Sequence, residues 1–152
     1  MKKDKAIERL RARVISEAKL LEEDSNNINR VRYLSMLVWR YMHGGSISKP
    51  EPLVFLSENA LKAGISRSDV ISEHKVPVAV MRDRIQGKSS FQILRILFRD
   101  TFWCHVTKEE DRQLRDSGYQ YKMPEVGTRY QACGIVIHPN KVSRELAFSK
   151  DC

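Results

Sequence analysis

Long apolar runs are absent from this chain of 152 residues. A helix that spans a membrane needs about 18 or more consecutive apolar residues. The longest run here lies within Ser35–Met42, and Arg40 interrupts it. The stretch that follows the N-terminus, Ala-Ile-Glu-Arg-Leu-Arg-Ala-Arg, is too charged for the apolar segment of a signal peptide. We therefore expect neither a membrane segment nor a signal peptide.

Cysteine is scarce, with only Cys104, Cys133 and Cys152, and no Cys-x-x-Cys pair occurs. An odd number of widely spaced cysteines is typical of a reducing compartment rather than of a disulfide framework. Structural zinc sites draw paired ligands from closely spaced positions, whereas Cys104 and His105, adjacent on a strand, would point to opposite faces. We expect a cytoplasmic protein with no metal ligands and no cofactor.

Acidic residues are in the minority, since 27 Lys and Arg stand against 19 Asp and Glu and give a formal net charge of +8. The first 50 residues hold 11 of the basic and 6 of the acidic side chains. Each phosphate contact releases condensed counterions, so a small basic protein is drawn to nucleic acid. We expect phosphate contacts from Arg9, Arg13, Arg30 and Arg32. An acidic protein partner is the alternative occupant of the same surface.

Apolar residues recur every three or four positions in residues 4–23 and again in residues 28–42, which predicts two amphipathic helices. The short polar segment between them predicts a helical hairpin. Two prolines in residues 46–52 favour an extended linker. These features predict a basic helical hairpin over 1–45 and a compact α+β core over 53–148, both within one cooperative domain.

The remainder mixes short helices with strands. Ser57 and Ser66 or Ser68 are placed to cap two short helices, the second beginning near Asp69. A further helix is expected from Pro77 to Ile85, with Gly87 as its stop, and an apolar segment follows in which Arg95 and Arg99 are four residues apart.

The C-terminal third has the composition of strands at Thr101–Val106 and Tyr119–Met123. Between them, Thr107 and Glu110 fit a capping box that begins a helix to about Asp116. The fold class that follows is α+β and mostly helical, with an N-terminal hairpin, short central helices and a small C-terminal β/α part.

The segment from Ala60 to Val70 places a small residue four positions before Gly64 and an apolar residue six positions after it. It resembles the repressor-type helix-turn-helix. The resemblance implies that Arg67 and Ser68 begin a recognition helix that contacts DNA bases. A second partial match covers residues 76–88, and an ordinary pair of packed helices is the alternative.

Residues 72–77 read Ser-Glu-His-Lys-Val-Pro. This Glu-His-x-x-Pro segment is similar to the opening of HNH-type nucleases. The resemblance implies that His74 is a general base that activates water and that Glu73 helps to hold a divalent cation such as Mg²⁺. The family also uses a downstream Asn and a second His, for which His105, or Asn140 with His138, are available. The alternative is a solvated carboxylate beside a histidine at a helix end.

Three hypotheses follow. The first is a small basic cytoplasmic protein that binds nucleic acid, is regulatory and carries no chemistry of its own. The second is an HNH-like, metal-dependent nuclease that uses Glu73 and His74. The third is an interaction or inhibitor module that binds an acidic protein through its N-terminal hairpin.

Overall fold

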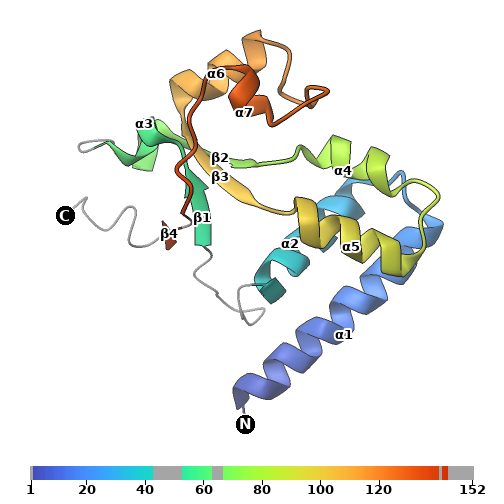
Figure 1. The fold of residues 1–152 in the computed structure, drawn as a ribbon. Helices are drawn as coiled ribbons and strands as arrows, with labels where there is room; N and C mark the ends of the chain where they lie inside the picture. The colour runs from blue at the N-terminus through green and yellow to red at the C-terminus, as the bar shows by residue number, and fades with distance from the viewer. Residues whose placement is uncertain (1, 43–52, 63–66, 141, 144–152) are drawn as a thin grey trace. The chain divides into compact units, whose positions relative to one another are not determined.

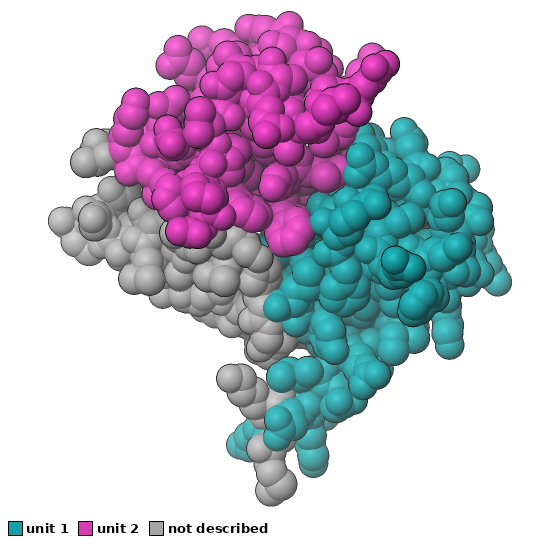
Figure 2. Space-filling view, in the orientation of Figure 1, with its two compact units in different colours: residues 1–52, 78–101 teal, residues 53–77, 102–152 magenta. Residues whose placement is uncertain are grey.

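The computed structural model describes residues 2–42, 53–62, 67–140 and 142–143 (Figure 1). The predicted linker at 46–52 and the turn at Gly64 lie outside these ranges. The fold is α+β and mostly helical, as predicted. Contacts divide the chain into two compact units (Figure 2). Unit 1 comprises residues 1–52 and 78–101, and unit 2 comprises 53–77 and 102–152. Residues 78–101 thus belong with the hairpin rather than with the expected 53–148 core.

The hairpin of unit 1 is formed by α1 (Lys2–Glu23) and α2 (Ile28–Met42), close to the predicted bounds. The apolar stripe of α1 is buried, with Leu10, Ala18 and Leu21 at 0% exposure. Val31, Leu34 and Val38 of α2 are equally buried. Because each helix has one apolar face and one charged face, the hairpin core forms by pairing the two apolar faces.

Two further helices complete unit 1, α4 (Val78–Ile85) and α5 (Ser90–Asp100). Gly87 after α4 has φ +67°, a left-handed conformation that glycine adopts without the strain of a Cβ. Ser89 then forms a capping box with Gln92 at the start of α5. The helix packs against α1, α2 and α4.

The sheet of unit 2 has the strand order β2-β3-β1-β4 within the described residues. The strands are β1 (Leu53–Leu56), β2 (Val70–His74), β3 (Trp103–Thr107) and β4 (Val142–Ser143). Strand β1 runs parallel to β3 and antiparallel to β4, and β2 runs antiparallel to β3. In β3, Cys104 lies opposite Glu73 and His105 lies opposite Ser72. Because successive residues of a strand alternate between its faces, Cys104 and His105 point to opposite sides of the sheet, as predicted.

The helices of unit 2 are α3 (Glu58–Leu61), the 3₁₀ turn η1 (Arg67–Asp69), α6 (Lys108–Asp116) and α7 (Arg129–Ala132). The predicted cap at Ser57 and the capping box of Thr107 with Glu110 are both present. A core forms where the helices meet the sheet, around Cys104, Val106, Leu114, Tyr130 and Ile135.

Two local predictions were wrong. The helix expected to begin near Asp69 is instead η1 followed by β2, because five consecutive residues pair with β3 and Val70 and Ile71 are β-branched. Residues 119–123 form no strand. Tyr119 packs against the core, and its carbonyl accepts a hydrogen bond from Arg129 at 3.1 Å. In both cases tertiary contacts outweigh local preference.

No helix in the described ranges has both the length and the apolar character needed to cross a bilayer.

Candidate nucleic-acid interface

Positive charge is concentrated in unit 1. Its residues include 16 Lys and Arg against 9 Asp and Glu, a balance of +7. Unit 2 has 11 basic and 10 acidic residues, a balance of +1. Any attraction to a polyanion by net charge therefore originates mainly in the helical unit.

The four hairpin arginines predicted to contact phosphate differ in their partners. Arg13 lies 3.6 Å from the Glu17 carboxylate, and Arg30 lies 3.2 Å from Asp24. Arg32 donates to the Asn29 side-chain oxygen at 3.2 Å. Arg9 is exposed, and neither it nor Arg32 pairs with a carboxylate among the described residues. The charges of two of the four predicted arginines, Arg13 and Arg30, are thus partly neutralised by carboxylates within the hairpin.

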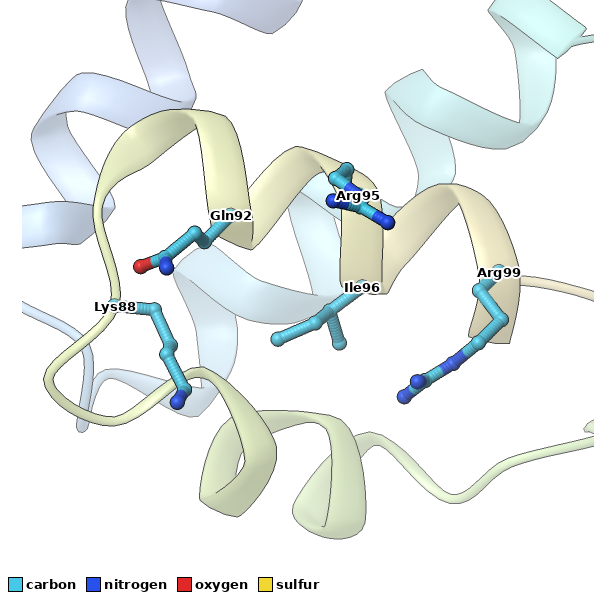
Figure 3. A pocket seen from close by; sticks show the side chains of 5 residues that line it. All are labelled: Lys88, Gln92, Arg95, Ile96 and Arg99. Atoms are coloured by element: carbon cyan, nitrogen blue, oxygen red, sulfur yellow. The ribbon is translucent and has the colours of Figure 1, made fainter.

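A groove along α5 has a stronger concentration of cations. It encloses about 350 Å³ and is lined by Lys88, Gln92, Arg95, Ile96 and Arg99 (Figure 3). The four helical residues are three or four positions apart or adjacent, which places them along one face of α5. Lys88 comes from the turn that Gly87 allows. Arg95 and Arg99 are four residues apart in the sequence, but neither was predicted as a binding residue, and the place of Lys88 in the groove depends on that turn.

The buried carboxylate of Asp100 lies next to Arg99 at the end of this groove and binds two arginines. Asp100 is 4% exposed and accepts from Arg84 at 2.7 Å and from Arg99 at 2.7 and 3.1 Å. Burial by itself would raise the pKa of Asp100, but the hydrogen bonds and charges of Arg99 and Arg84 outweigh burial and lower the pKa. Lys88 and Arg95 have no acidic partner among the described residues. The groove therefore has surplus positive charge.

Arg67 and Ser68, the predicted base-contacting residues, lie in η1 of unit 2. Ser68 is exposed. The chain enters β2 directly after η1, so these residues do not begin the α-helix that the helix-turn-helix resemblance implied. The structure assigns them to a different unit from the hairpin arginines.

Glu73 and His74 occupy successive positions in β2, so their side chains point to opposite faces of the sheet. His74 stacks against Trp103, with ring centroids 4.1 Å apart. Glu73 instead lies 3.2 Å from Arg129. The HNH resemblance implied that Glu73 and His74 act together on one reacting group. The structure does not bring their side chains together in this way. Within the described ranges, no three His, Cys, Asp or Glu residues form a group that could hold a metal ion.

The surroundings of Glu73 form an internal polar cluster. Burial raises the pKa of Glu73 to about 7, and a hydrogen bond with Asp111 acts in the same direction, while the charge of Arg129 opposes them. Tyr130 donates weakly to the same carboxylate oxygen at 3.5 Å. Glu73 can therefore bind a proton near neutral pH.

Arg129 is 3% exposed and links three segments of unit 2. Besides Glu73, it donates to the carbonyl oxygens of His74 at 2.6 Å and of Tyr119 and Gln120 at 3.1 Å. These bonds connect the end of β2, the 119–120 loop and α7. No periodic pattern in the sequence distinguished this arginine from exposed ones.

No protein-family model matches this chain, and no significant match to it is found among curated proteins or solved structures.

Proposed function

We propose that this protein binds nucleic acid through the phosphate backbone, with the α5 groove of unit 1 as the main contact. The observation that carries the proposal is the alignment of Lys88, Arg95 and Arg99 in one groove, with two of these cations lacking an acidic partner among the described residues. The balance of +7 in the same unit supports long-range attraction of a polyanion.

The groove suits phosphate groups in its size and its donors. From Gln92 to Arg99 the helix rises roughly 10 Å, about the axial rise of three nucleotides in one strand. Arginine donates two parallel hydrogen bonds to phosphate oxygens, and lysine supplies a compact charge. The Gln92 side-chain oxygen accepts the Ser89 backbone N–H at 3.0 Å, which leaves its amide N–H groups as donors.

These contacts would position a backbone without reading its bases, because phosphate carries no sequence information. The proposal is accordingly a cytoplasmic, regulatory binding protein that acts by occupying nucleic acid and needs no cofactor. Duplex DNA, single-stranded DNA and RNA all present the same phosphate chemistry, and their relative affinities are to be measured.

The test is a salt titration of binding to a short duplex by fluorescence anisotropy. Lys88→Ala/Arg95→Ala removes two groove cations. Each lost phosphate contact should reduce the slope of log K against log salt by about 0.9 for duplex DNA and about 0.7 for a single strand. The matched control is Lys108→Ala/Arg112→Ala, which removes the same two residue types from exposed positions of α6 in unit 2.

The proposal holds if the groove variant loses slope and affinity while the control variant binds like the wild type. An equal loss in both variants would show that only net charge matters, and an unchanged slope in the groove variant would exclude the groove. If an acidic protein is the true partner, binding to every nucleic acid will be weak. Heparin will then displace the wild type and the groove variant from nucleic acid equally well.

A further inference from the structure

A second cavity has a volume of about 500 Å³, and the described residues that line it all belong to unit 2. Apolar side chains form part of its wall, among them Phe55, Ile135 and Ile137. Lys75, Thr128 and Gln131 are among its polar lining residues, and no Asp or Glu of the described residues lines it. A cavity of this size with mixed walls is typical of sites for small organic molecules.

Lys75 brings a positive charge to this cavity. It is half-buried, and its ammonium lies 4.4 Å from the centroid of the Phe55 ring. Its backbone N–H donates to the Phe102 carbonyl at 2.7 Å, which fixes the chain at this point. No carboxylate of the described residues pairs with the ammonium. The aromatic face favours a cation but accepts no conventional N–H hydrogen bond, so the ammonium N–H groups have no acceptor among the described residues.

Thr128 and Gln131 present donors as well, because the capping box of α7 uses their acceptors. The Thr128 hydroxyl oxygen accepts the Gln131 backbone N–H at 3.2 Å, and the Gln131 side-chain oxygen accepts the Thr128 backbone N–H at 2.9 Å. The Thr128 O–H and the Gln131 amide N–H groups have no acceptor among the described residues. Together with Lys75, they give the lining of this cavity a set of donors, and the described lining residues include no carboxylate to pair with them.

We propose that this cavity binds a small organic anion, a carboxylate or phosphate monoester with an apolar or aromatic body. The anionic group is held by Lys75, Thr128 and Gln131, and the apolar body contacts Phe55 and the isoleucine side chains. The site is separate from the groove of unit 1 and stands or fails independently of nucleic-acid binding.

The test uses the full chain, with binding followed by amide shifts in ¹H–¹⁵N correlation spectra. The probes are phenyl phosphate, benzoate, inorganic phosphate and the neutral phenol. We expect saturable binding of phenyl phosphate or benzoate, with shifts in residues 128–139. Inorganic phosphate should bind more weakly because it lacks the apolar body, and phenol because it lacks the charge. Comparing phenyl phosphate with benzoate distinguishes the two kinds of anionic group.

Two variants address the donors. Lys75→Met removes the charge and keeps most of the stem, and Gln131→Glu keeps the capping oxygen while replacing the donor amide with a carboxylate. Each should weaken binding of the preferred anion about tenfold or more, as expected when a charge-assisted contact is lost. Lys122→Met, an exposed lysine of unit 2 that does not line the cavity, is the matched control and should bind like the wild type.

Absence of saturable binding by both organic anions would overturn the proposal. So would equal binding of phenol, or unchanged affinity in both variants with native spectra. Displacement of phenyl phosphate by a short oligonucleotide that binds more tightly at the same residues would overturn it in favour of a nucleic-acid backbone site. Equal affinity for inorganic and phenyl phosphate would exclude the apolar part of the site.

Discussion

Two ion pairs with the same separation show how the two units differ. Arg30 and Asp24 in unit 1 lie 3.2 Å apart, with side chains 40% and 51% exposed. Arg129 and Glu73 in unit 2 also lie 3.2 Å apart, but they are only 3% and 11% exposed. Water screens the first pair and is largely excluded from the second, so equal distances have unequal energetic consequences. Distance alone does not rank ion pairs in this protein.

The difference extends to what each unit can do with its charges. Unit 1 keeps most of its cations at the surface, where they are available to an external polyanion and contribute little to stability. Unit 2 places Arg129 inside, where it links backbone segments and is not available to an external polyanion. We therefore expect substitution of the exposed cations of unit 1 to affect nucleic-acid binding, and substitution of the buried Arg129 of unit 2 to affect stability.

The largest effect is expected from Arg129→Met. The variant removes the partner of Glu73 and the donor to three backbone carbonyls, which should lower the free energy of unfolding by about 3–5 kcal/mol. Urea denaturation followed by circular dichroism measures it. Arg112→Ala, an exposed arginine of the same unit, is the control and should change stability by less than about 0.5 kcal/mol. A loss below about 1 kcal/mol for Arg129→Met would contradict the role assigned to this residue.

Next in size is a pH effect at Glu73. The pKa of its carboxyl is raised from an ordinary 4.5 to about 7, so between these values the folded state binds more protons than the unfolded state. The free energy of unfolding should therefore fall as pH rises through this window, by about 1–3 kcal/mol relative to Glu73→Gln. Urea titrations at about pH 5 and about pH 8 on both proteins isolate this contribution. Parallel pH profiles for the two proteins would show that Glu73 does not titrate near neutrality.

A smaller effect is expected when Arg9, Arg13, Arg30 and Arg32 are all replaced by Ala. Because Arg13 and Arg30 already pair with carboxylates, the salt slope for duplex DNA should fall by only about two contacts at about 0.9 each, not four. Fluorescence anisotropy across a salt series gives the slope. A fall in the salt slope equivalent to four contacts would show that the ion pairs do not reduce phosphate binding. An unchanged slope would show that the hairpin is not part of the interface.

The smallest effect is expected from Arg30→Ala, which sharpens the contrast with Arg129. Its exposed pair with Asp24 should contribute less than about 0.5 kcal/mol to the free energy of unfolding. The measurement is the same urea series, run also at high salt, where the difference from the wild type should shrink further. A loss comparable to that of Arg129→Met would mean that burial does not separate the two pairs.

The helices of this protein were largely predictable, and the candidate site was predictable in part. Periodicity identified α1 and α2, and the residue types at Thr107 and Glu110 identified the start of α6. These signals depend on contacts within a few residues along the chain. The spacing of Arg95 and Arg99, four residues apart, was visible in the sequence, but the predicted binding residues included the hairpin arginines and not these. The cavity lined by Lys75 and Gln131 had no such signal, because these two residues are 56 positions apart in the sequence.

The sequence by itself determined the α+β class, the helical hairpin, the helix caps at Ser57 and Thr107 and the excess of positive charge, since each follows from local pattern or composition. Only the tertiary structure decided that 70–74 is a strand, because pairing with β3 supplies hydrogen bonds that no local segment offers. The burial of Arg129, the exposure of Arg30 and the position of Glu73 and His74 on opposite faces also depend on the tertiary structure. Burial is a property of the surrounding chain, and the free energy of a charged group depends on those surroundings.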